Sequence, residues 1–219
     1  MVRQVARVRV GQVKTKICGI TNYEDAEAVV AAGCDAAGFV FYKGSPRYIS
    51  PEEARKIIRK MPAHIIKVGV FVNEKEELIR QIAEDCKLDM LQFHGNESKE
   101  FCKKFKNYRV IKSFRIKKRK DLKSILDYNV FAYLFDTFDK NKIGGTGKKF
   151  DWKLIRHIDG IRRPVFLSGG LSEKNIKKAI SSVHPDWVDV SSSVEVKPGI
   201  KDHLKVKGFI EAVKNAKRS

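Results

Sequence analysis

The chain has 219 residues, of which 42% are hydrophobic and 32% are charged, proportions typical of a globular rather than a disordered protein. This length suits one domain, or at most two small ones. The formal net charge is +19, because 45 Lys and Arg residues stand against 26 Asp and Glu residues. Such a charge is typical of nucleic-acid-binding proteins, and also of proteins that attract small anions such as phosphorylated ligands.

Several classes of protein are excluded by the sequence. No uninterrupted apolar stretch approaches the ~20 residues that a membrane span needs. Residues 1–13 carry three arginines without an apolar run or a small-residue cleavage site, so we interpret them as an appended basic arm rather than a secretory signal. The four scattered cysteines predict free thiols, a cytoplasmic location and no metal site. The high Lys and Glu content is also typical of thermophilic proteins.

Short apolar runs recur along the chain at intervals of about 25 residues. They are too short for helices and rich in Val, Ile and Phe, so we predict eight buried parallel strands. The predicted strands are Thr15–Cys18, Ala36–Phe41, Lys67–Val72, Met90–Phe93, Val110–Phe114, Tyr133–Asp136, Val165–Ser168 and Trp187–Val190.

Longer amphipathic stretches between these runs predict helices. The first follows Thr21 and Asn22, either of which can cap it, and the second follows Ser50 with Pro51 in its first turn. A Gly/Lys loop at Asn141–Lys149 precedes a short helix near Asp151–His157. The remaining predicted helices are Tyr23–Ala32, Pro51–Met61, Glu74–Cys86, Glu97–Lys106, Lys120–Tyr128, Ser172–Val183 and Asp202–Ala216.

Eight strands alternating with helices predict an α/β fold, a single (β/α)8 TIM barrel over residues 14–219. The alternative with the same local pattern is a doubly wound open sheet, although the first strand is not followed by the glycine fingerprint of a dinucleotide-binding fold. No linker or composition break divides the chain. In a TIM barrel the active-site residues follow the C-terminal ends of the strands, and candidates are therefore sought there.

Two candidate acid–base residues end strands of the predicted barrel. Cys18 ends the first strand, where surrounding helix N-termini would favour a thiolate with a pKa near neutrality; the alternative is a buried cysteine that packs as a small hydrophobic residue. Asp136 ends the sixth strand, where burial would raise its pKa and suit a general acid; the alternative is an aspartate that caps a turn.

Small residues follow the last two strands, with Gly169 and Gly170 after the seventh and Ser191, Ser192 and Ser193 after the eighth. Small side chains let backbone N–H groups approach an anion, and TIM barrels often bind phosphate between these two loops. We therefore predict a phosphate site, with two ordinary turns as the alternative.

Other polar residues lie near the predicted barrel mouth. Arg47, in the loop after the second strand, suits bidentate recognition of a carboxylate, unless it is a solvated surface arginine. Gln92 and His94 end the fourth strand, and His94 either titrates near neutral pH or has a structural role. The lysine runs lack interleaved aromatic residues for base stacking, so we interpret them as solvated surface.

The motifs follow one another in an order that resembles the phosphoribosylanthranilate isomerase family of tryptophan biosynthesis. The resemblance runs from about Lys16 to Val213 and covers nearly the whole chain apart from the N-terminal arm. The motifs that carry it are Lys16–Thr21, Gly38–Phe41 with Ser45–Ser50, Leu91–Gly95, Phe135–Thr137, Gly144–Gly147 with Phe150–Trp152, and Leu167–Leu171.

This resemblance implies an Amadori rearrangement of phosphoribosylanthranilate to 1-(2-carboxyphenylamino)-1-deoxyribulose 5-phosphate, without a redox cofactor. It implies that Cys18 is the general base, that Asp136 is the general acid and that Arg47 holds the anthranilate carboxylate. Gly169, Gly170 and Ser191–Ser193 match the phosphate site. The expected partner is therefore a small phosphorylated substrate, and the chain is expected to be a monomer or homodimer.

One position departs from the family pattern, because Ser193 stands where the family usually has glycine. A serine there would be strained if the backbone needs a positive φ. Asp189, in the eighth strand, is expected to orient neighbouring groups. Two other functions stay open: a different barrel enzyme that acts on a phosphorylated ligand, and a basic nucleic-acid-binding module. The second lacks a recognition helix, zinc finger or RNP strand, so we expect no specific nucleic acid partner.

Overall fold

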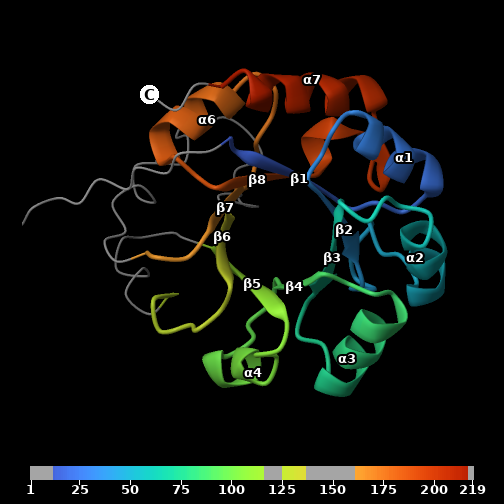
Figure 1. The fold of residues 1–219 in the computed structure, drawn as a ribbon, viewed down its shortest axis with the longest axis vertical. Helices are drawn as coiled ribbons and strands as arrows, with labels where there is room; N and C mark the ends of the chain where they lie inside the picture. The colour runs from blue at the N-terminus through green and yellow to red at the C-terminus, as the bar shows by residue number, and fades with distance from the viewer. Residues whose placement is uncertain (1–11, 116–124, 137–160, 217–219) are drawn as a thin grey trace, which may run out of the picture.

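The computed structural model describes residues 12–115, 125–136 and 161–216. Its barrel strands are β1 (Lys14–Cys18), β2 (Ala36–Val40), β3 (Ile66–Phe71), β4 (Met90–Phe93), β5 (Arg109–Arg115), β6 (Ala132–Asp136), β7 (Val165–Ser168) and β8 (Trp187–Val190). All neighbours pair in parallel, and β8 pairs with β1, so the sheet closes on itself. The ring of strands lies at the centre of Figure 1, with the helices around it. The predicted TIM barrel is confirmed, and the open-sheet alternative is wrong.

Several of the helices begin where a side chain accepts from a free N–H group of the first turn. Asn22, rather than Thr21, caps the first helix by accepting from the N–H of Asp25 at 2.7 Å. Ser50 and Glu53 form a reciprocal capping box at the start of the second helix. The described helices are α1 (Tyr23–Ala31), α2 (Pro51–Ile58), α3 (Glu76–Asp85), α4 (Lys99–Lys103), α6 (Ile176–Val183) and α7 (His203–Lys214).

Some predicted helices are shorter in the structure. α6 begins at Ile176 instead of Ser172, because the Asn175 side chain bonds the N–H of Ser172 and the carbonyl of Gly170 and so holds a turn there. Of the predicted helix Lys120–Tyr128, only residues 125–128 are described, and they form a short 3-10 end and a turn.

Several predictions fall on residues outside the described ranges. They are the loop at Asn141–Lys149, the short helix near Asp151–His157 and most of the basic arm, residues 1–11. Of the last two residues of the predicted arm, Gln12 is exposed, whereas Val13 is buried in the core.

Between β8 and α7 the chain forms a short turn and a hairpin that were not predicted. A single 3-10 turn, η2 (Ser192–Val194), leads into an antiparallel hairpin of β9 (Glu195–Lys197) and β10 (Ile200–Lys201). Gly199 sits in the turn of this hairpin with a φ of +84°, a conformation that glycine adopts without strain. The hairpin places two charged residues, Glu195 and Lys201, beside the end of β1.

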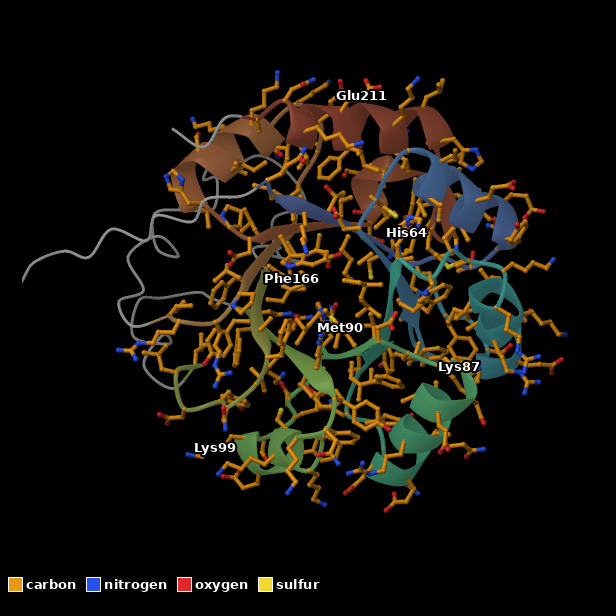
Figure 2. All side chains as sticks on the ribbon, viewed as in Figure 1. His64, Lys87, Met90, Lys99, Phe166 and Glu211 are labelled. Atoms are coloured by element: carbon orange, nitrogen blue, oxygen red, sulfur yellow. The ribbon has the colours of Figure 1, made fainter. Side chains whose placement is uncertain are left out.

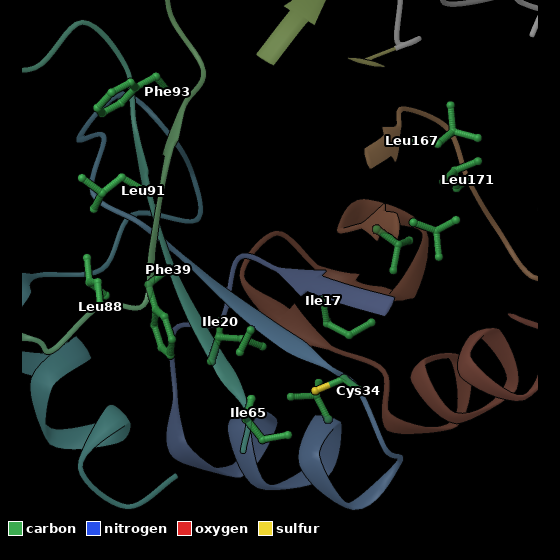
Figure 3. Close-up of a cluster of buried hydrophobic side chains, with 14 of the residues drawn as sticks. Ile17, Ile20, Cys34, Phe39, Ile65, Leu88, Leu91, Phe93, Leu167 and Leu171 are labelled. Carbon is green, nitrogen blue, oxygen red and sulfur yellow. The ribbon is translucent and has the colours of Figure 1, made fainter. Parts of the chain in front are cut away.

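Side chains alternate between the inside of the barrel and the layer under the helices, as the period of two in a strand requires. Figure 2 shows Met90 and Phe166 inside the ring of strands, and Phe166 stacks on Trp187 with ring centroids 4.8 Å apart. Figure 3 shows part of the larger outer cluster, in which Phe39 and Leu91 lie between strands and helices. The inner cluster consists of Ala36, Val68, Met90, Ile111, Ala132, Leu134, Phe166 and Trp187.

Candidate active site

The alternation that fills the barrel also fills its mouth with polar groups. Side chains two positions apart on a strand point to the same side of the sheet. A residue two positions after an inward apolar residue therefore also points inward, and it lies nearer the C-terminal end of the strand. Gln92 follows Met90 in this way, and Asp189 follows Trp187. The polar or titratable residues at inward positions near the mouth include Lys16, Cys18, Gln92, Ser113, Asp136 and Asp189. Apolar packing below and reactive groups above therefore come from one pattern.

Lys16 and Asp189 form a buried ion pair next to Cys18. The Lys16 Nζ donates to the Asp189 Oδ1 at 2.9 Å, and both side chains are almost completely buried. Gly38 on β2 leaves room for this group, because a Cβ there would lie 2.9 Å from the Cys18 Sγ and 3.0 Å from the Lys16 Nζ. The expected orienting role of Asp189 thus has a defined partner, Lys16.

The environment of Cys18 does not favour the thiolate in the way that its position at a barrel mouth predicts. Burial raises the pKa of the Cys18 thiol above its usual range, while the positive charges of Lys16 and Lys201 oppose this rise only in part. This shift runs opposite to the expected one toward neutrality. Burial alone would lower the pKa of Lys16, but Asp189 and Cys18 raise it above its usual value, so Lys16 carries a positive charge.

The Asp136 carboxylate faces His94, and the other ring nitrogen of His94 contacts two side chains. The His94 Nε2 is 3.5 Å from the Asp136 Oδ2, and the His94 Nδ1 is 2.9 Å from both the Gln92 Nε2 and the Ser113 Oγ. Gln92 is buried, so the imidazole is fixed by strands β4 and β5 while its other nitrogen faces β6. Gln92, His94 and Asp136, each expected near the barrel mouth, thus lie together, and Ser113 is a further member of this group that was not predicted.

Arg47 is not a solvated surface arginine. Its Nε and Nη2 donate to the two carboxylate oxygens of Glu195 at 2.8 Å and 2.7 Å. The Lys201 Nζ donates to the same carboxylate at 2.8 Å. Neither Glu195 nor Lys201 was predicted as a site residue, since Glu195 is 148 positions from Arg47 and no local pattern links the two. The Pro198-Gly199 pair between them was an available sign of the hairpin that carries both.

The loops after β7 and β8 lie against each other at the mouth. The Ser193 hydroxyl donates to the carbonyl of Leu171, and the Ser191 hydroxyl donates to the carbonyl of Cys18 at 3.0 Å. Gly169 and Gly170 have φ values of +92° and +63°, which their lack of a side chain permits. These two serine hydroxyls are therefore committed to backbone carbonyls.

Ser193 is not strained. Within the described ranges, the non-glycine residues with positive φ are Asn73, Lys87 and His184, and Ser193 is not among them. The chain can therefore hold serine at this position, where the family usually has glycine, without a backbone penalty.

A cavity of about 480 Å³ opens beside His94 on the β4–β5 side of the mouth. It borders Ser113 and Lys112 and is mostly polar in its lining residues, which are Val72, Asn73, His94, Gly95, Asn96, Glu97, Lys112, Ser113, Phe114, Arg115 and Tyr128. Over the described part of the chain, no group of three His, Cys, Asp or Glu side chains could hold a metal ion. The same residues contain no helix long and apolar enough to cross a membrane.

The sequence matches the family described as "N-(5'phosphoribosyl)anthranilate (PRA) isomerase" over residues 15–212. The chain belongs to this family. Among curated relatives, the N-(5'-phosphoribosyl)anthranilate isomerase of Trichlorobacter lovleyi is 46% identical over 93% of this chain and 99% of its own length. The one of Thermotoga petrophila is 48% identical over 94% of this chain and 98% of its own length.

Solved structures of phosphoribosyl anthranilate isomerases have the same fold. The enzyme from Thermotoga maritima has a TM-score of 0.86 at 47% identity, covering 92% of this chain and 98% of that one. A second structure, in complex with reduced 1-(o-carboxyphenylamino)-1-deoxyribulose 5-phosphate, has a TM-score of 0.82 at 45% identity with the same coverage. A third, of monomers derived from the dimeric Thermotoga maritima enzyme, has a TM-score of 0.81 at 44% identity, again with this coverage.

Proposed function

We propose that this chain is an N-(5'-phosphoribosyl)anthranilate isomerase of tryptophan biosynthesis. It would convert the aminoaldose into 1-(2-carboxyphenylamino)-1-deoxyribulose 5-phosphate. The observation that carries the proposal is that Cys18 and Asp136 end β1 and β6 at inward positions of one barrel mouth, with Arg47 beside the first of them. The stem of Arg47 packs against Gly19, where a Cβ would lie 2.7 Å from the Arg47 Cδ.

Asp136 is proposed as the general acid of the first step. It protonates the ring oxygen of the ribose, the bond from that oxygen to C1′ breaks, and the amine lone pair forms a Schiff base with C1′. His94, held by Gln92 and Ser113, is the group in position to orient the Asp136 carboxyl. Mutual orientation of this kind is what a positioned acid needs to act in the transition state.

Cys18 is proposed as the general base of the second step. It removes the proton from C2′, and the electron pair moves to give an enolamine, which tautomerises to the ketone. The thiolate that accepts this proton needs a nearby positive charge in its buried surroundings, and Lys16 and Lys201 supply it. Each of the two proton transfers is typically worth about 10²–10⁴-fold in rate.

The two ends of the substrate are both anions. We assign its carboxylate to Arg47 and its phosphate to the loops that carry Gly169, Gly170 and Ser191–Ser193. Because the hydroxyls of Ser191 and Ser193 already donate to carbonyls, backbone N–H groups are the proposed phosphate ligands. Acid–base chemistry alone completes the rearrangement, so no redox cofactor is part of the proposal. We further propose a cytoplasmic enzyme that is a monomer or homodimer.

The decisive experiment follows the loss of phosphoribosylanthranilate fluorescence with wild type, Cys18→Ala and Asp136→Ala. Each substitution should lower kcat by about 10²–10⁴-fold with a much smaller change in KM, because both groups act in the transition state. Cys86→Ala, a buried cysteine at the end of α3, is the matched control and should keep near-normal turnover. Near-normal turnover in either site variant removes that residue from the mechanism, and an inactive wild type refutes the function.

A further inference from the structure

We propose that Glu195, held by Lys201, is a positioning residue that aims Arg47 at the carboxylate of the substrate. Through Arg47 it would make the enzyme selective for an aromatic amine that carries this carboxylate. The inference rests on the proposed function, because it assumes that Arg47 binds that group. Neither Glu195 nor Lys201 needs to touch the substrate in this role.

The geometry of the Arg47–Glu195 ion pair leaves the tip of the Arg47 guanidinium available for a second carboxylate. Glu195 takes the Nε and Nη2 side of the guanidinium with both of its oxygens. An arginine bonded along this side keeps the Nη1 protons and the second Nη2 proton, which form a fork at the tip of the side chain. The Arg47 side chain is 21% exposed, whereas that of Glu195 is 3% exposed. A second carboxylate can therefore bind at the tip without displacing Glu195.

The charges of Arg47, Glu195 and Lys201 do not cancel completely, which keeps Arg47 attractive to an anion. Burial alone would raise the pKa of Glu195, but Arg47 and Lys201 lower it, so the carboxylate stays ionised. The side chain of Lys201 is completely buried, and its Nζ also donates to the Cys18 carbonyl at 2.6 Å. Burial lowers the pKa of Lys201, and Glu195 opposes this effect. When Lys201 is protonated, two cations against one anion leave a net charge of one positive unit beside Cys18, which one substrate carboxylate would neutralise.

The same network ties the carboxylate site to the base. Lys201 and Ser191 both donate to the carbonyl oxygen of Cys18, and Ser191 also lies 3.4 Å from Glu195. The backbone N–H of Lys201 donates to the buried Asp25 of α1 at 2.8 Å, which fixes the hairpin. Arg47 is thus held at a set position relative to Cys18, so that binding the carboxylate also places C2′ relative to the thiol.

Loss of the Glu195 charge should loosen Arg47 and weaken its contact with the carboxylate. Glu195→Gln keeps the shape of the side chain but removes its negative charge and one of its two acceptor oxygens, because an amide NH2 group cannot accept from Arg47. We expect a KM for phosphoribosylanthranilate that is raised about tenfold, with a much smaller change in kcat, because the contact is equally present in ground and transition states. A substrate without the carboxylate should not distinguish the variant from wild type.

The experiment compares two ligands in wild type and Glu195→Gln. Calorimetry measures Kd for reduced 1-(o-carboxyphenylamino)-1-deoxyribulose 5-phosphate and for its counterpart without the carboxylate, and kinetics measures kcat and KM with the two corresponding substrates. Glu76→Gln is the matched control, since Glu76 likewise accepts from the Nε and Nη2 of an arginine, Arg80, but does so on helix α3, away from Arg47. It should leave the preference for the carboxylate unchanged. Glu195→Asp, whose shorter side chain keeps the charge, should recover part of the preference.

A loss of about tenfold confined to the carboxylate-bearing ligand supports the proposal. Equal losses for both ligands, or no loss for either, overturn it. In an Arg47→Ala background, Glu195→Gln should have no further effect on carboxylate preference, and an additional loss would also overturn it. If Glu195→Gln does not fold, the comparison of wild type with Glu195→Asp on the same two ligands decides. A wild type that turns over neither substrate refutes the proposed function, while the Kd comparison still tests Glu195.

Discussion

Cys18 occupies a position with two opposed requirements. A base must lose its proton, but burial raises the pKa of the Cys18 thiol and favours the protonated form. Lys16, fixed by Asp189 at 2.9 Å, supplies a positive charge that opposes the effect of burial. The balance between burial and this ammonium group would therefore set the pH range in which Cys18 can act as the proposed base.

Replacing Lys16 by methionine should move the Cys18 pKa further upward. The substitution removes the ammonium charge and leaves the negative charge of Asp189 unpaired beside Cys18. Both effects disfavour a thiolate. The rate of Cys18 alkylation by iodoacetamide, followed by mass spectrometry, rises as pH increases through the pKa, and this rise should shift to higher pH in Lys16→Met. Lys67→Met, at a buried lysine near Asp89, should leave it in place. An unshifted or downward-shifted profile in Lys16→Met would contradict the assigned role of Lys16.

The loop between β4 and α4 is fixed by a buried pair on the side of the sheet that faces the helices. The Glu97 carboxylate accepts from the N–H groups of Asn73 and Gly95, and the Lys112 Nζ donates to Glu97 at 3.0 Å. Lys112 also donates to the carbonyls of Phe93 and Gly95. These bonds join three successive βα units next to His94, so the element that carries His94 depends on them.

Lys112→Met should destabilise the fold strongly. It leaves the buried Glu97 without its cation, and removal of one partner from a buried pair typically costs about 3–5 kcal/mol. Urea unfolding followed by circular dichroism gives the change. Lys56→Met, which breaks an exposed pair with Glu52 on α2, is the control and should change the midpoint little. Similar midpoints for the two variants would refute the structural role of Lys112.

For the whole molecule, we propose that the charge of +19 acts as a field that attracts a substrate with two anionic groups. The binding groups within the site act at short range, whereas the remaining lysines and arginines act over the distance that salt leaves unscreened. The charge that first pointed to nucleic acid thus has a use in an enzyme with a phosphate and a carboxylate at the two ends of its substrate.

Raising the ionic strength from about 0.02 M to about 0.3 M should therefore lower kcat/KM for phosphoribosylanthranilate several-fold, because the Debye length shortens. The substrate without the carboxylate carries less charge and should show a smaller decrease. Sucrose at matched viscosity serves as the control for slower diffusion. A kcat/KM that does not depend on salt would show that the overall charge does not assist binding.

The sequence by itself determined the barrel and the strand ends at which the candidate residues lie. Short β-branched runs alternating with capped helices specify buried parallel strands, and Cys18 and Asp136 were found because they end such strands. Strand ends and helix starts can be located in this way because they are local features that nearby residues encode.

Only the tertiary structure decided the electrostatics and the partners. The pKa of Cys18 depends on how deeply closure of the barrel buries the thiol, which its neighbours in sequence do not specify. Arg47 and Glu195 are 148 positions apart, and they meet because β8 pairs with β1 and closes the ring. Contacts created by that closure have no periodic signature in the chain, so they become visible only when the ring is formed.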